Sequence, residues 1–161
     1  MTDNLTDINF MNLAIDLALK AEADGNVPVG SVITFNNAVI AVGASTLLNP
    51  LYDPNGHAEM NAIDNVDVNL WPYAKDMTCY TTLEPCCMCF GRILLTGIGR
   101  IVFGAIDPEG GSGVVRNHLP RYYNESNVPK WIGPIMPEKC DALFQRVFSA
   151  FNRITSHINQ A

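Results

Sequence analysis

The chain is poor in charged residues, and in basic residues above all. Only 16% of its 161 residues are charged, and 10 Lys and Arg face 16 Asp and Glu, which gives a formal net charge of −6. An acidic protein repels the phosphate backbone of a nucleic acid, so this balance disfavours tRNA and other nucleic acids as partners. Long apolar runs are missing too, since no stretch approaches the roughly 18 residues of a membrane-spanning helix. We therefore expect no membrane partner.

The chain also lacks a cysteine pattern that would suit a disulfide framework. Its five cysteines are an odd number, and those at 86, 87 and 89 fall within four positions. Residues 1–7 are polar and acidic, without the basic start or the apolar run of a secretory signal. Together these absences predict a cytoplasmic protein that keeps its thiols reduced.

What the chain does contain is enough apolar residues for one core. With 161 residues, 48% of them apolar, it has the size and composition of a single globular domain. We predict one domain over residues 1–161. Residues 9–112 carry the motifs, and residues 113–161 form a divergent loop region and a C-terminal helix.

The spacing of apolar residues predicts alternating helices and strands. Periods of three and four indicate helices over 9–23, 57–65, 87–95 and 137–154. Runs of β-forming residues indicate strands over 29–34, 38–42, 77–82 and 101–105. A connection at 35–37 makes the first two strands a hairpin, and a short edge strand is expected within 128–135. This order predicts a three-layer α/β/α sandwich around a mixed, partly parallel sheet.

One constellation in the sequence carries chemistry. His57 precedes Cys86 by 29 residues, and Cys86 and Cys89 stand three positions apart at the start of a predicted helix. Thiolates at i and i+3 on a helical turn point the same way and can bind one ion, and the helix start favours their ionised form. One imidazole and two thiolates predict one Zn²⁺ per chain. Because structural zinc sites normally have four protein ligands, three indicate a catalytic site with a position left for water.

Glu59, two residues after His57, would lie beside the metal without being needed as a ligand. There its carboxylate can take a proton from water and pass it on, which is general acid–base catalysis. Zinc lowers the pKa of bound water from 15.7 to about 7, so hydroxide is available at neutral pH. The predicted reaction is attack on an amine-bearing ring carbon. The alternatives are a structural zinc clip and a set of thiols that binds no metal.

The motif His57-x-Glu59 followed by Pro85-Cys86-x-x-Cys89 resembles the signature of the cytidine/deoxycytidylate-type zinc deaminases. Further stretches, at 27–30, 82–86 and 99–105, are similar to bacterial tRNA adenosine deaminases, guanine deaminases and fungal-type cytosine deaminases. The resemblance implies a five-stranded sheet flanked by helices, a homodimer or larger assembly, and release of ammonia from a base. It also implies that backbone groups near Ala58 and Glu84 hold the substrate. The candidate substrate contacts are Val29, Ser45, Ala58, Glu84 and Phe90.

Two departures from the family pattern bear on the substrate. Ser45 is the nearest equivalent of the substrate-binding Asn of the tRNA and guanine enzymes, and a hydroxyl does not offer the paired donor and acceptor of an amide. The C-terminal stretch 140–161 has only Arg146 and Arg153 as fixed positive charges. We therefore expect a free nucleobase or nucleoside, such as guanine or cytosine, with Phe90 and Trp131 stacking on its ring. The alternatives are a tRNA wobble adenosine deaminase and a catalytically inactive zinc-binding subunit.

Overall fold

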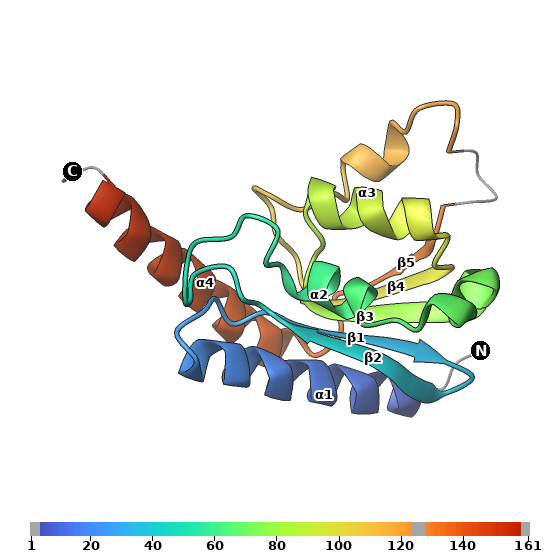
Figure 1. The fold of residues 1–161 in the computed structure, drawn as a ribbon, viewed down its shortest axis with the longest axis horizontal. Coiled ribbons are helices and arrows are strands. Elements are labelled where there is room, and N and C mark those ends of the chain that lie inside the picture. Colours follow the sequence, from blue (N-terminus) through green and yellow to red (C-terminus); the bar gives the residue numbers. More distant parts are fainter. Residues whose placement is uncertain (1–3, 124–127, 159–161) are drawn as a thin grey trace.

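The computed structural model describes residues 4–123 and 128–158 of the chain. Its centre is a five-stranded sheet with the order β2-β1-β3-β4-β5, and helices cover both faces (Figure 1). The strands are β1 (Gly30–Phe35), β2 (Ala38–Ala44), β3 (Met77–Leu83), β4 (Arg100–Ala105) and β5 (Lys130–Ile132). The helices are α1 (Asn4–Ala23), α2 (Ala58–Asp64), α3 (Cys87–Thr96) and α4 (Pro137–Ile158), with short 3₁₀ helices η1 (Val68–Asp76) and η2 (Val115–Asn117).

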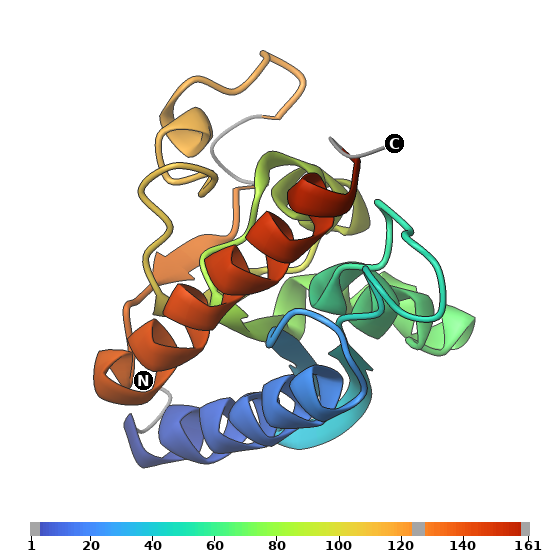
Figure 2. The ribbon, with the colours of Figure 1, turned by 90° about the vertical axis from the view of Figure 1, so that its left-hand side faces the viewer.

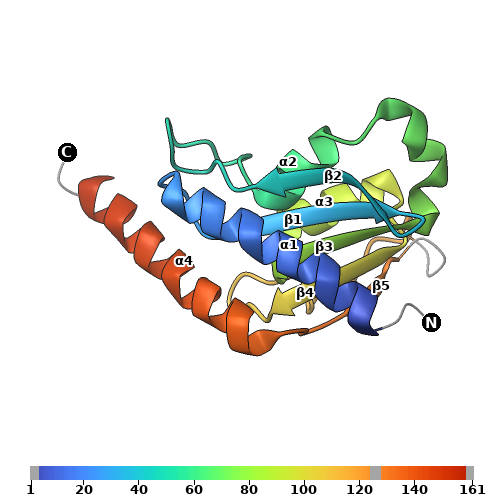
Figure 3. The same ribbon diagram turned by 90° about the horizontal axis from the view of Figure 1, so that it is seen from below.

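The sheet is mixed, as predicted. Strand β1 pairs antiparallel with both β2 and β3, whereas β3, β4 and β5 run parallel to one another. Helices α1 and α4 lie against one face and α2 and α3 against the other (Figure 1). Seen from below, α1 crosses in front of the strands (Figure 3). The predicted three-layer α/β/α sandwich with a mixed five-stranded sheet is confirmed.

Alternation along the strands builds one core on each side of the sheet. Ile33 and Cys79 face α2 and α3, while their chain neighbours Val32 and Tyr80 face α1 and α4. Because successive side chains of a strand point to opposite faces, one apolar strand supplies both cores.

Two local devices place the elements that carry the site. Asn36 and Asn37 both have positive φ, at 51° and 58°, so they close a two-residue hairpin that sets β2 beside β1. At Gly43 of β2, a Cβ atom would lie 2.1 Å from the backbone oxygen of Ala58. Only glycine lets β2 approach α2 this closely, and this approach fixes the start of α2 relative to the sheet.

The elements differ from the sequence prediction mainly at their ends. Helix α1 begins at Asn4 rather than at residue 9. Apolar periodicity missed this first part of the helix because Asp7, a polar residue, lies on its buried side. There the Asp7 carboxylate accepts hydrogen bonds from Tyr80 and Arg100. The predicted edge strand within 128–135 is only three residues long, at 130–132. Across the described ranges, no helix has the length and apolar character needed to cross a membrane.

Candidate active site

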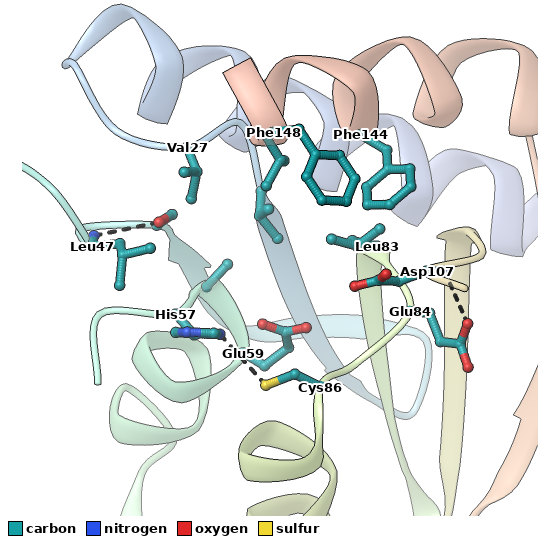
Figure 4. Close-up of a pocket in the computed structure, with 14 residues that line it drawn as sticks. Val27, Leu47, His57, Glu59, Leu83, Glu84, Cys86, Asp107, Phe144 and Phe148 are labelled. Atoms are coloured by element: carbon teal, nitrogen blue, oxygen red, sulfur yellow. Dashed lines mark hydrogen bonds between the residues drawn. The ribbon is translucent and has the colours of Figure 1, made fainter. Parts of the chain in front are cut away.

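A pocket opens where β3 and β4 end, at the edge of the sheet where α2 and α3 begin (Figure 4). It encloses a cavity of about 150 Å³. In open α/β sheets the carboxyl ends of the strands are the usual place for a ligand. The pocket is lined by Val27, Val29, Ser45, Leu47, His57, Ala58, Glu59, Leu83, Glu84, Cys86, Asp107, Phe144, Val147 and Phe148.

The three predicted metal ligands converge at the floor of this pocket. His57 Nδ1 lies 3.7 Å from Cys86 Sγ and 3.5 Å from Cys89 Sγ. All three ligand atoms lie within 4.8 Å of one another. Tetrahedral zinc, with Zn–S of about 2.3 Å and Zn–N of about 2.05 Å, separates its sulfur and nitrogen ligands by about 3.6 Å. The residues therefore fit a zinc ion, and three protein ligands would leave one coordination position for water.

Helix starts position two of the three ligands. His57 is the N-cap of α2 and Cys86 is the N-cap of α3, and both have extended backbones. Neither side chain is used to cap its helix, which leaves the imidazole and the thiol free to bind metal. Cys89 lies one turn into α3 and is fully buried. The metal would therefore join the first turns of α2 and α3.

The two thiols are electrostatically unequal in the absence of a metal ion. The hydrogen bond from Cys89 lowers the pKa of Cys86 to about 4, against the opposing effect of burial, and His57 lowers it further. The same hydrogen bond, followed by burial, raises the pKa of Cys89. A bound zinc ion would remove this inequality, since both coordinating thiols would then be deprotonated.

Glu59 points from the first turn of α2 toward the metal ligands, and its side chain is 3% exposed (Figure 4). Its Oε2 lies 3.5 Å from Cys89 Sγ, while its Oε1 accepts a hydrogen bond of 3.0 Å from the Thr81 hydroxyl. Burial raises the pKa of Glu59 above its ordinary value. A carboxyl group held in this way beside a metal site suits proton transfer.

Four of the five candidate substrate contacts lie in the pocket wall, and one does not. Val29, Ser45, Ala58 and Glu84 line the cavity. Phe90 is 1% exposed and points from α3 into the core, where its ring meets the Trp131 ring edge-on with 5.4 Å between the centroids. The Trp131 ring also packs against Phe103 of β4, with 5.2 Å between those centroids. The stacking surface predicted from Phe90 and Trp131 is therefore wrong, because both rings are used to join α3 to the sheet.

The Glu84 side chain turns away from the cavity and holds a loop (Figure 4). Its carboxylate accepts hydrogen bonds from the backbone N–H groups of Asp107, at 3.0 Å, and Gly113, at 2.8 Å. Ser112 adds a hydrogen bond of 2.6 Å to the backbone oxygen of Pro85, next to Cys86. Glu84 and Ser112 thus fasten residues 107–113 to the segment that carries a metal ligand. The Glu84 carboxylate is engaged by this loop, and the substrate contact expected of the Glu84 backbone stays a prediction.

The sequence did not predict that side chains of α4 would line the pocket. Phe144 and Phe148 of α4 lie on the side of the cavity opposite His57 and Glu59 (Figure 4). Val147 of the same helix also lines the cavity. Helix α4 runs obliquely past α1 across this end of the molecule (Figure 2). The amphipathic pattern of α4 indicated a buried face, but not that part of this face would border the site.

The fold and the site together define a zinc-dependent hydrolytic deaminase. A family model for the cytidine and deoxycytidylate deaminase zinc-binding region matches residues 5–105. The chain belongs to this family, whose members act on C–N bonds. The family membership predicted from the motifs at His57–Glu59 and Pro85–Cys89 is confirmed.

Similarity to individual relatives extends beyond the residues of the metal motifs. The chain is 36% identical over 143 residues to a tRNA-specific adenosine deaminase of Bacillus subtilis, covering 86% of each protein. It is 37% identical over 95 residues to a cytosine deaminase of Candida albicans, covering 58% of this chain and 63% of that one. Among solved structures, one from a study of tRNA:A34 deaminases superimposes with a TM-score of 0.71 at 27% identity, over 84% of this chain and 99% of the other.

If zinc binds to Cys86 and Cys89, its removal should change which cysteines react with an alkylating reagent. With zinc bound, iodoacetamide should modify Cys87, which is exposed, and spare the four remaining cysteines. After chelation, Cys86 should also react, because it is partly exposed and its pKa is lowered to about 4. Burial raises the pKa of Cys79 and Cys140 to about 12, so these two should stay unmodified in both forms. Peptide mass spectrometry reads out the result, and equal labelling of Cys86 before and after chelation would contradict the metal assignment.

Proposed function

We propose that this protein deaminates adenosine in a tRNA, releasing ammonia and leaving inosine. This reverses the preference for a free base drawn from the sequence. The observation that carries the proposal is the similarity to the Bacillus subtilis enzyme, which extends over 86% of both chains and therefore beyond the metal motifs. The name of that relative states a tRNA substrate, and the relative with a free-base name matches a shorter part of this chain.

The chemistry follows from the residues of the pocket. A zinc ion held by His57, Cys86 and Cys89 would polarise water and make it a nucleophile near neutral pH. Glu59 takes a proton from the attacking water as the water oxygen bonds to the ring carbon that bears the amino group. Glu59 then delivers this proton to the departing nitrogen, so the C–N bond breaks and ammonia leaves. Backbone groups around Ala58 and Glu84 hold the ring in place.

A second candidate, a free nucleobase or nucleoside, is favoured by the charge distribution around the pocket. No Lys or Arg belongs to the described residues that line it. Elsewhere in the described ranges, four cationic side chains are paired with carboxylates: Lys20 with Asp24, Arg92 with Asp64, Arg100 with Asp7, and Arg146 with Glu22. Arg153, the other basic residue named in the C-terminal stretch, has a side chain outside the described residues. Paired cations contribute less to phosphate binding than free ones.

The substrate test uses one zinc-loaded preparation and two groups of substrates. One group is a tRNA anticodon hairpin and the same hairpin with guanosine in place of the target adenosine. The other group is guanine, cytosine, adenine and their nucleosides. We expect ammonia from the adenosine hairpin alone, with apparent affinity falling steeply as salt rises, because phosphate contacts release counterions. Turnover of a free base without turnover of the hairpin would reject the tRNA proposal in favour of the second candidate.

We further propose that the protein is a cytoplasmic homodimer. The odd set of five cysteines supports a reducing compartment, and the family resemblance supports the dimer. Light scattering at micromolar concentration should give twice the 17.6 kDa mass of one chain. A monomeric mass under these conditions would contradict the dimer without affecting the site.

A further inference from the structure

We infer that Thr81 is a positioning residue for Glu59, whose hydroxyl holds one carboxylate oxygen and thereby directs proton transfer to the other. The inference rests on the proposed function of Glu59 as the proton carrier. It goes beyond that function because Thr81 belongs neither to the deaminase motifs nor to the residues that line the pocket.

The contact is isolated and buried. The Thr81 hydroxyl donates to Glu59 Oε1 at 3.0 Å, and within the described ranges it forms no other hydrogen bond. Thr81 is 0% exposed, in the middle of a β3 strand buried on both faces. A buried hydroxyl without a partner is costly, so its proton must be directed at the carboxylate.

A β-strand does not by itself require a hydroxyl at this position. Valine has nearly the same shape as threonine and a similar preference for strands, and it would bury no polar atom. The next residue, Thr82, has a different partner: its Oγ1 accepts a hydrogen bond of 3.2 Å from the backbone N–H of Gly30. Of these two adjacent buried threonines, Thr82 binds the backbone of β1 and Thr81 binds the Glu59 carboxylate.

The hydrogen bond makes the two oxygens of Glu59 unequal. Oε1 accepts a hydrogen bond of 3.0 Å from the Thr81 hydroxyl, whereas Oε2 accepts only a weaker one of 3.5 Å from the Cys89 thiol, which a metal-bound thiolate would no longer donate. The oxygen with the stronger hydrogen bond is the poorer site for the transferred proton, so this proton is carried on Oε2. The same contact prevents rotation of the carboxylate. Such positional control matters because a misplacement of about 1 Å at a reacting group can cost roughly 100-fold in rate.

The test compares Thr81→Val with Thr81→Ser, using Thr82→Val as the matched control. In Thr81→Val we expect kcat to fall about 10- to 100-fold while KM and zinc content stay unchanged. Thr81→Ser restores the donor, so its kcat should stay within about 3-fold of the native value. Thr82→Val also removes a buried hydroxyl, but its loss of kcat should be several-fold smaller. A crystal structure of Thr81→Val should show the Glu59 carboxylate turned or divided between rotamers.

Each failure has a distinct meaning. Native kcat in Thr81→Val, or an equal loss in Thr82→Val, overturns the positioning role. Loss of zinc from Thr81→Val also overturns it, because the effect would then act through the metal. If Thr81→Val does not fold, Thr81→Ala against Thr81→Ser gives the same comparison of a missing and a present donor. Activity that survives in Glu59→Gln would instead contradict the proposed function of Glu59.

Discussion

Replacement of Glu59 by Gln should reduce kcat by roughly 10²- to 10⁴-fold, the usual contribution of general acid–base catalysis. Glutamine matches the shape of glutamate and can still accept the hydrogen bond from Thr81, but it cannot carry a proton between water and the leaving nitrogen. Zinc content and melting temperature should remain close to native, because Glu59 is not a metal ligand. The measurements are ammonia release, metal analysis and thermal unfolding on one preparation.

Glu109→Gln provides the control for this substitution. Glu109 is an exposed carboxylate in the turn that follows β4 and does not line the pocket. The same chemical change there should leave kcat within about 2-fold of native, as expected for a surface substitution. A Glu59→Gln protein with native kcat would remove the proton carrier from the account. It would leave open the alternative of a zinc-binding subunit whose activity lies elsewhere.

The second large effect is expected for Cys86→Ser. A serine hydroxyl stays protonated at neutral pH and cannot replace a thiolate ligand, so the variant should lose its zinc and with it all measurable ammonia release. Thermal stability should fall too, since a metal bound to His57, Cys86 and Cys89 would join the first turn of α2 to that of α3. Metal analysis and thermal unfolding measure the two consequences separately.

Cys87→Ser is the matched control, because Cys87 is the next residue and its thiol is exposed. This variant should keep its zinc, its activity and its melting temperature. Equal zinc loss from both variants would mean that the Cys86 to Cys89 segment is damaged by any substitution. Full zinc retention in Cys86→Ser would contradict the ligand set itself.

The sequence was sufficient to predict the layers of the fold and the residues of the metal site. Apolar periodicity gave the alternation of helices and strands, because each element must bury a face. The metal site was visible because His57, Cys86 and Cys89 follow from spacing and ligand chemistry, which are properties of the chain itself. Their convergence within 4.8 Å agrees with that prediction.

The pocket wall was harder to predict because it is assembled from distant segments. Phe148 reaches the site only through the path of α4, and no local pattern distinguishes a pocket-lining phenylalanine from a core one. Phe90 shows the opposite error: its position beside Cys89 suggested the pocket, but the helical turn directs it into the core. Thr81 looked like an ordinary strand residue, since its role depends on a partner 22 positions away.

The most direct test of the account is zinc dependence of deamination. Protein stripped by a chelator, then restored with zinc, should lose ammonia release and recover it in proportion to the metal bound at His57, Cys86 and Cys89. The substrate is whichever member of the panel the native protein converts, with Glu59→Gln measured in parallel. We expect no turnover by the stripped protein, and recovery on adding zinc only for the native sequence and not for Glu59→Gln. Equal ammonia release by stripped and zinc-loaded protein would contradict the claim that this chain is a zinc-dependent deaminase.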